Sequence, residues 1–388
     1  GAVVGASLHG AILWTIPGMA ALRSWDIFCR VIDNLGDIGV CWRLSAELAG
    51  RGQRVRLWVD DPSPLSSMAP GAVEGRWPGV RVLPWSRSAD PSVLTGLEPA
   101  DVWVEGFGCE PELAFVAHRF GGMAGSGPPP PPVWINLEYL SAERFAERCH
   151  GLPSPLGQGP AKGHVRWFFY PGLTAATGGL LRETDLAARR AAFDRAAWLA
   201  RWNIRLAGEQ VVSMFCYEPA GLGPWMRERS QDARPTLLLV PSGRASAAVR
   251  SHLGGSARAT EGSPGRHTAG SLSIVFLPPL TQPDFDHLLW ACDANFVRGE
   301  DSLVRALWAG KPFVWQIYPQ SDQAHQGKLA AMLDAWAAPA SWREFHRAWN
   351  GLTDGNGARW EPDRWAPAVE SVRSGLEAQP DLCQRLCA

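Results

Sequence analysis

Short apolar runs alternate with segments of helical spacing along most of this chain. Residues 27–31 form one such run, and residues 37–48, which follow it, place apolar side chains at the spacing of one helix face. Residues 55–59 form the next run. Parallel strands need a crossover connection, which is usually a helix, so this alternation predicts parallel βαβ units. The pattern therefore restricts the chain to the α/β class.

The alternation forms two series, and at 388 residues the chain is too long for one ordinary core. The other strands predicted in the first series are 80–83, 102–104, 133–137 and 167–170. The strands predicted in the second series are 211–216, 237–240, 274–277, 294–297 and 313–317, with helices at 284–292 and 301–309. We predict two doubly wound, Rossmann-like domains, residues 20–186 and 187–365, with a ligand cleft between them.

Several segments outside these series carry predictions of their own. Residues 187–203 are rich in Ala and Arg and are predicted to form a helix that connects the domains. Residues 363–386 also have helical spacing, and we expect the C-terminal helix, 366–388, to pack back on the first domain. Residues 121–132 are predicted to be an exposed loop of Gly and Pro, and residues 254–270 a polar loop without periodicity.

The first 18 residues are apolar but match no targeting segment. They are short for a membrane span, contain Pro17 and lack the basic start of a signal peptide. One hypothesis is that Met19 is the native start. Mass spectrometry of the natively expressed protein tests it.

Composition excludes several functional classes. The formal net charge is -1, so no broad basic field is available to bind nucleic acid. The eight cysteines form no CxxC pair and lie mostly in apolar surroundings, which predicts buried thiols in a cytoplasmic protein. No ligand pairs have the spacing of a zinc site, so we expect no metal. We expect no membrane contact either.

The first candidate site is the acidic turn after the strand predicted at 27–31. It contains Asp33 and Asp37, separated by a turn with Gly36. Ligands of open α/β sheets bind beyond the carboxyl ends of strands, so a carboxylate there can act as a base or hold a cationic acceptor. The alternative for Asp37 is a helix N-cap, worth about 1 kcal/mol.

The second candidate site is the turn that runs from Arg298 to Ser302 and opens the helix predicted at 301–309. Helix N-termini bind phosphates, and Arg298 and Ser302 add suitable donors. Glu300 would repel a phosphate but accept hydrogen bonds from sugar hydroxyls. The alternative is a capped helix with an ion pair.

Two further groups border the same rim. Phe215 and Tyr217 end the strand predicted at 211–216, where aromatic rings can stack on a nucleobase, although a core Phe is the simpler explanation. Tyr318 and Gln320 follow the strand predicted at 313–317. Together the four groups indicate a nucleotide-sugar glycosyltransferase: nucleotide diphosphate on the second domain, acceptor on the first. No GxGxxG or Walker loop is present, which argues against a dehydrogenase and a P-loop kinase.

Six motifs in this order resemble those of the protein-arginine rhamnosyltransferases that modify bacterial elongation factor P. The motifs are VIDNLGDIG (31–39), NLEYLS (136–141), GGL (178–180), FCY (215–217), RGEDS (298–302) and IYPQ (317–320). The resemblance implies a GT-B glycosyltransferase fold and dTDP-β-L-rhamnose as the donor. It also implies inverting transfer to one arginine of elongation factor P, which activates the factor for ribosomes stalled at polyproline, without a cofactor.

The resemblance also assigns roles to residues. Asp37 matches the general base, and Asp33 and Glu300 match two further essential carboxylates. The positions that match the donor site are Phe215, Tyr217, Phe276, Arg298, Asp301, Ser302, Tyr318 and Gln320. Leu35 stands where Phe is usual and Leu137 where Trp is common. Two alternatives remain open: a glycosyltransferase for a small-molecule or lipid acceptor, and a non-catalytic nucleotide-binding module.

Overall fold

The structure is a computed structural model. It describes residues 22–32, 35–121, 130–253, 258–259, 265–319, 324–355 and 357–388. Three residues that carry predictions, Met19, Asp33 and Gln320, lie outside this part of the chain, as do residues 1–18.

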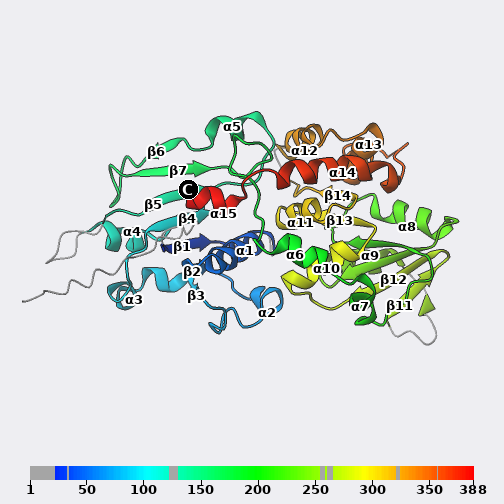
Figure 1. Ribbon diagram of the computed structural model, residues 1–388, viewed down its shortest axis with the longest axis horizontal. Helices are drawn as coiled ribbons and strands as arrows, with labels where there is room; N and C mark the ends of the chain where they lie inside the picture. The colour runs from blue at the N-terminus through cyan, green and yellow to red at the C-terminus, as the bar shows by residue number, and fades with distance from the viewer. Residues whose placement is uncertain are drawn as a thin grey trace, which may run out of the picture.

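Two seven-stranded sheets organise the molecule (Figure 1). The first has the order β3-β2-β1-β4-β5-β7-β6, in which every neighbouring pair is parallel except β6 with β7. Its strands are β1 (Ser24–Cys29), β2 (Arg54–Val59), β3 (Val80–Pro84), β4 (Val102–Gly106), β5 (Val133–Leu137), β6 (Pro153–Pro155) and β7 (Val165–Phe169). Each strand predicted in the first series overlaps one of these strands, so the parallel βαβ prediction is confirmed.

The second sheet has the order β10-β11-β12-β9-β8-β13-β14 and is parallel from β12 to β14. Its strands are β8 (Gln210–Met214), β9 (Thr236–Pro241), β10 (Arg258–Ala259), β11 (Arg266–Ala269), β12 (Leu272–Leu277), β13 (Ala294–Arg298) and β14 (Phe313–Gln316). The strands β8, β9, β13 and β14 are buried along their whole length, because helices cover both faces of the sheet. Strands buried on both faces read as continuous apolar runs, which is why they could be predicted.

The helices surround the two sheets and also lie between them (Figure 1). Those of the first half are α1 (Gly36–Gly50), α2 (Leu65–Met68), η1 (Trp85–Ala89), α3 (Pro91–Thr95), α4 (Leu113–Phe120) and α5 (Arg144–Cys149). Those of the second half are α6 (Leu186–Ala191), α7 (Arg195–Ala200), α8 (Leu222–Gln231), α9 (Arg244–Leu253), α10 (Gln282–Ala291), α11 (Asp301–Ala309), α12 (Ala324–Ala335), α13 (Ala340–Trp349), α14 (Pro362–Glu377) and α15 (Leu382–Cys387). Contacts between α1 and α11 join the halves.

Tryptophan supplies much of the core on both sides. The Trp side chains among the largest that are fully buried are Trp25, Trp42, Trp58, Trp103, Trp315, Trp336, Trp342, Trp349 and Trp365. A buried ring of this size removes a large apolar area from water and so contributes strongly to stability. Most of the tryptophans are therefore packing residues.

The helix predicted at 187–203 is wrong as one element. The chain forms α6 and α7 instead, because the Asp194 carboxylate accepts a hydrogen bond from the Ala197 N–H at 2.9 Å and starts a new helix. The polar loop predicted at 254–270 is also wrong in part, since β11 pairs antiparallel with β12.

The C-terminal segment, predicted as one helical stretch, contains two helices. Asp381 and Gln384 form a capping box that starts α15 after Pro380. Leu382, Cys383 and Leu386 of α15 belong to the same apolar cluster as the inner face of α1. The last helix therefore packs on the first half of the molecule (Figure 1). The predicted domain boundaries stay predictions.

Among the described residues, no helix combines the length and the apolar character that crossing a bilayer requires.

Candidate functional site

Both predicted acidic turns lie where the strand order of a sheet reverses. In the first sheet the chain continues from β1 to β2 and β3 on one side, and β4 and β5 lie on the other. In the second sheet β9 and β13 flank β8 in the same way. Loops leave in opposite directions at such a point, which opens a crevice at the carboxyl ends of the strands. The turn of Asp37 follows β1, and the turn of Glu300 follows β13.

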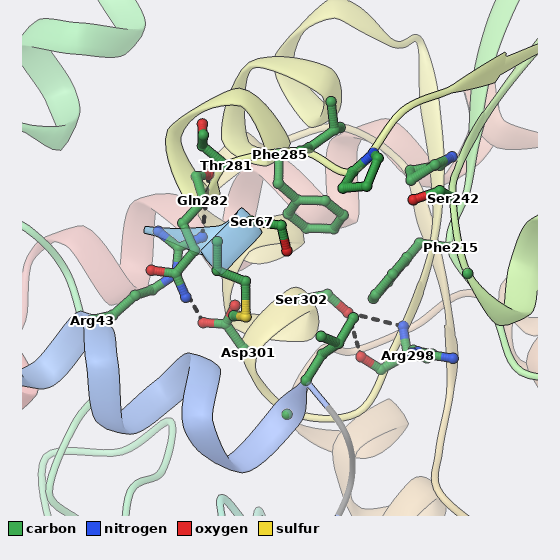
Figure 2. Close-up of a pocket in the computed structure, with 17 residues that line it drawn as sticks. Arg43, Ser67, Phe215, Ser242, Thr281, Gln282, Phe285, Arg298, Asp301 and Ser302 are labelled. Carbon is green, nitrogen blue, oxygen red and sulfur yellow. Dashed lines mark hydrogen bonds and ion pairs between the residues drawn. The ribbon is translucent and has the colours of Figure 1, made fainter. Parts of the chain in front are cut away.

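A cavity of about 280 Å³ lies between the two halves (Figure 2). Its volume is close to the lower end of small-molecule sites, about 300–1,000 Å³. The first half contributes Leu35, Gly36, Arg43, Ser67 and Met68. The second half contributes Phe215, Pro241, Ser242, Gly243, Pro279, Leu280, Thr281, Gln282, Phe285, Arg298, Asp301 and Ser302. One side is mainly apolar and aromatic, and the other carries the first turn of α11.

The turn between β13 and α11 is held by its own side chains. The Ser302 hydroxyl accepts a hydrogen bond from the Arg298 N–H at 2.9 Å and donates one to the Arg298 carbonyl. Figure 2 shows both contacts beside the cavity. They aim the start of α11, where Asp301 is the first helical residue, at the cavity. The positive end of the helix dipole therefore faces the space where a ligand would lie.

Arg298 lies between the two predicted aromatic residues. Its guanidinium carbon is 4.6 Å from the centre of the Phe215 ring and 4.5 Å from that of Tyr217. Stacked cations of this kind are attracted to the ring faces. Phe215 lines the cavity, but Tyr217 is buried behind Arg298, in edge contact with Tyr318 at 5.6 Å. The structure therefore places Phe215, Arg298, Asp301 and Ser302 at the cavity. The buried Tyr217 and the exposed Tyr318 are not among the described residues that line it.

The structure places Phe276 elsewhere. The Arg250 guanidinium covers its ring at 3.6 Å, and Phe276 is not among the described residues that line the cavity. The aromatic residue of this region that does line it is Phe285, whose ring lies 5.1 Å from that of Phe215. Sequence reasoning missed Phe285 and Gln282. A signal was available, because both follow the carboxyl end of β12, on the rim already assigned to the ligand.

Asp37 is 4% exposed, and its partners in the described part of the first half include Ile32 and Tyr139. Its carboxylate accepts hydrogen bonds from the Ile32 N–H at 2.9 Å and from the Tyr139 hydroxyl at 3.4 Å. The N-cap of α1 is Leu35, without a side-chain hydrogen bond. The alternative that Asp37 is the cap of α1 is therefore wrong. Asp33 lies outside the described residues.

Glu300 contacts both halves. One carboxylate oxygen accepts the Leu140 N–H at 3.0 Å, and the other accepts the Lys328 ammonium at 2.9 Å. Burial raises the pKa of Glu300 because burial disfavours the charged carboxylate. The charge of Asp37 raises this pKa further, and the charge of Lys328 lowers it. Glu300 and Asp37 are therefore close enough to influence each other across the junction of the halves.

A buried cluster of charges closes the other side of the cavity. Arg43 of α1 forms ion pairs with Asp286 at 3.0 Å and with Asp301 at 3.0 Å. Arg305 reaches the same Asp286 at 2.8 Å and Glu183 at 2.7 Å. Burial disfavours the charged form of Arg43, but the carboxylates outweigh it and raise its pKa. The cluster joins α1 to α10 and α11 and holds Asp301 beside the cavity.

Burial likewise raises the pKa of Asp301, while Arg43 and Arg305 act against that effect. A second contact across the junction supports the cluster, since the Gln282 side-chain amide donates to the Gly39 carbonyl at 3.0 Å. With its carboxylates paired to cations, the start of α11 can accept an anionic ligand despite Glu300 and Asp301. The arrangement suits a molecule with a flat ring at one end and phosphates at the other.

A model of the EarP family, described as "Elongation-Factor P (EF-P) rhamnosyltransferase EarP", matches residues 25–388. The chain belongs to this family. A protein-arginine rhamnosyltransferase of Pseudomonas putida is 41% identical to it over 94% of this chain and 97% of the relative. The protein of the same name from Pseudomonas aeruginosa is 40% identical over 94% and 98%. The predicted family is therefore confirmed, and with it the prediction that the chain is a rhamnosyltransferase.

A solved structure agrees with this membership. It is described as the structural basis for EarP-mediated arginine glycosylation of translation elongation factor EF-P. It has a TM-score of 0.62 and 31% identity, and covers 94% of this chain and 97% of the solved chain. The predicted GT-B fold, with two Rossmann-like sheets facing one cleft, is confirmed.

Proposed function

We propose that this protein transfers L-rhamnose from dTDP-β-L-rhamnose to an arginine side chain of elongation factor P, with inversion at the anomeric carbon. The observation that carries the proposal is the cavity between the halves, lined by aromatic rings and by the start of α11, in a chain of the EarP family. Asp37 and Glu300 do not line this cavity themselves but directly adjoin Gly36 and Asp301, which do. The names of the relatives support arginine as the acceptor and rhamnose as the sugar. The eight unpaired cysteines support a cytoplasmic enzyme.

The aromatic side of the cavity would hold the thymine. Phe215 and Phe285 offer ring faces and edges there, and a stacked base is worth about 1–3 kcal/mol. The diphosphate would then lie at the start of α11, where the helix dipole stabilises negative charge. This charge grows as the sugar–phosphate bond breaks, so the same contacts favour the transition state over the ground state.

Three carboxylates, Asp33, Asp37 and Glu300, would hold the acceptor. A guanidinium has a pKa above 12, and removing its proton at pH 7 before reaction would cost about 7 kcal/mol. Proton transfer therefore accompanies bond formation in this proposal. A guanidinium nitrogen attacks the anomeric carbon, the bond from that carbon to the diphosphate breaks, and Asp37 takes the proton from the attacking nitrogen. Asp33 and Glu300 would orient the planar cation through their oxygens. Full inversion follows from attack on the face opposite the leaving group.

Mass analysis of elongation factor P after incubation with the protein and dTDP-β-L-rhamnose tests the proposal. We expect the mass of one rhamnose on one arginine, and none on a factor in which that arginine is replaced by lysine. An unmodified factor, together with rhamnose on an added lipid or small molecule, would support the alternative acceptor. Saturable dTDP binding without any turnover would support a binding module.

The variant Asp37→Asn tests the assigned base. The substitution keeps the size of the side chain but removes its capacity to take a proton. General-base catalysis contributes about 10²–10⁴-fold, so we expect a loss of that size in kcat with dTDP binding retained. Transfer at the normal rate by a folded Asp37→Asn protein that binds dTDP would refute the role.

A further inference from the structure

Two side chains outside the predicted site lie between its carboxylates. Tyr139 follows β5 in the first half, and Lys328 lies on α12 in the second. The Tyr139 hydroxyl is 3.4 Å from Asp37, and the Lys328 ammonium is 2.9 Å from Glu300. The ammonium also lies 5.6 Å from the centre of the Tyr139 ring. The four side chains therefore form one connected group across the junction of the halves.

The surroundings of Tyr139 hold its ring in place. The ring stacks on Phe107 with centroids 4.5 Å apart and an angle of 17° between the planes. Phe107 has a positive φ of 58°, a conformation that costs energy for a residue other than glycine. The strained turn after β4 thus positions the Phe107 ring for stacking on Tyr139. Because this stack holds the Tyr139 ring, the Tyr139 hydroxyl has a defined position beside Asp37.

The ion pair of Lys328 is mostly removed from water. The exposed fraction is 20% for the Lys328 side chain and 15% for that of Glu300. An ion pair in such surroundings is screened much less than one at the surface. The Leu140 N–H occupies the other oxygen of Glu300, so the carboxylate is held by groups from both halves.

We propose that Lys328 and Tyr139 are positioning residues for the transfer reaction. Lys328 holds Glu300 as a carboxylate aimed at the acceptor, and Tyr139 orients Asp37 to receive the proton. This inference rests on the proposed function, because it needs a cationic acceptor between the two carboxylates. A cationic acceptor requires Glu300 to be ionised.

The electrostatics of the group agree with these roles. Among the described residues, the charged or titratable groups that face Glu300 include Lys328 on α12, Asp37 on α1 and Tyr139 after β5. Burial and Asp37 raise the pKa of Glu300, and Lys328 is the cation that opposes both. Burial and the charge of Asp37 raise the pKa of Tyr139 as well, so the phenol keeps its proton and can donate to Asp37.

The pH dependence of kcat/KM tests the role of Lys328. We expect Lys328→Met to move the acidic limb of the profile up by about one to two pH units, because a neighbouring cation lowers the pKa of a carboxyl by about 1–3 units. The variant Lys328→Arg keeps the charge and should restore the wild-type limb. Affinity for dTDP should stay at the wild-type value. If Lys328→Met does not fold, Lys328→Gln takes the same test.

Tyr139→Phe tests the second half of the inference, since it removes one oxygen and leaves the stack on Phe107. We expect kcat to fall about tenfold, as for the loss of a hydrogen bond to a charged group, with KM for the donor unchanged. A rise in donor KM with kcat intact would overturn the role of Tyr139.

The outcomes separate this inference from the proposed function. Wild-type transfer of rhamnose to elongation factor P, combined with an unshifted acidic limb in Lys328→Met, overturns the inference and leaves the function standing. Wild-type protein that transfers no rhamnose at any pH overturns both. A shifted limb that Lys328→Arg restores supports the inference.

Discussion

Removing Arg43 should destabilise the protein strongly, because Arg43 joins the two halves through buried ion pairs. The substitution Arg43→Met keeps the apolar stem and deletes the charge. In this variant Asp286 keeps its ion pair with Arg305 at 2.8 Å, but Asp301 loses its ion pair with Arg43 at 3.0 Å. Breaking a buried pair by removing one partner costs about 3–5 kcal/mol. Since Arg305 remains, we expect the lower end, about 3 kcal/mol.

Equilibrium unfolding in urea, followed by tryptophan fluorescence, measures this loss. The matched control is Arg54→Met, because Arg54 is 63% exposed and lies 3.6 Å from an exposed Glu98. An exposed pair of this kind contributes about 0–1 kcal/mol. The two substitutions delete the same group and differ in burial and in the number of partners.

The pH dependence gives a second test of the same reasoning. Burial raises the pKa of Asp301 in the folded protein, and Arg43 opposes that effect. Without Arg43 the pKa rises further, and a raised carboxyl pKa contributes stability at low pH that is lost as the pH rises. The deficit of Arg43→Met should therefore be larger at pH 8 than at pH 5. A deficit no larger than that of the Arg54 variant, or one independent of pH, would refute the reasoning.

Three further predictions concern other parts of the molecule. Burial raises the pKa of Glu105 from its usual value of 4.5 to about 7, so the free energy of unfolding of the wild-type protein should fall from pH 5 to pH 7. Urea unfolding measures this slope, and the Glu105→Gln protein should lack it. A Cβ on Gly106 would lie 2.8 Å from the Cys41 sulfur, so Gly106→Ala should lower the free energy of unfolding by about 1–3 kcal/mol. The control Gly50→Ala places its Cβ in open space and should not lower Tm. Phe285→Ala should weaken dTDP binding about tenfold in calorimetry, whereas Phe276→Ala should not, because of these two rings only that of Phe285 lines the cavity. Equal losses of affinity in the two variants would contradict this assignment of the base site.

The elements that carry the site follow from local sequence. Buried parallel strands read as apolar runs, and the residues after β8 and β13 lie at the carboxyl edge of one sheet. Phe215, Arg298, Asp301 and Ser302 could therefore be assigned to one rim before the structure was known.

The contacts between the halves could not be predicted in this way. Arg43 is one charged residue on a helix, and nothing within α1 indicates that Asp286, far along the chain, neutralises it. Tyr217 lies two residues from Phe215 and so on the same side of the chain, but Arg298 inserts between the rings and takes Tyr217 out of the cavity. Such insertions depend on the packing of whole elements, which local patterns do not contain.

Helix ends were the other source of error. The expected helix at 187–203 has continuous helical composition, yet Asp194 starts a second helix inside it. Asp is a common N-cap, so the signal was present, but the Ala-rich composition around it favoured one long helix. The break before α15 has a clearer signal in Pro380, which lacks the backbone N–H that a helix needs.

A structure of the protein with dTDP bound tests the central claim most directly. The account predicts the thymine against Phe215 and Phe285, and the diphosphate at the start of α11 beside Arg298 and Ser302. The β-phosphate should point toward the gap between Asp37 and Glu300, where the sugar would be attacked. A nucleotide bound outside this cavity, or a β-phosphate directed away from the two carboxylates, would contradict the account.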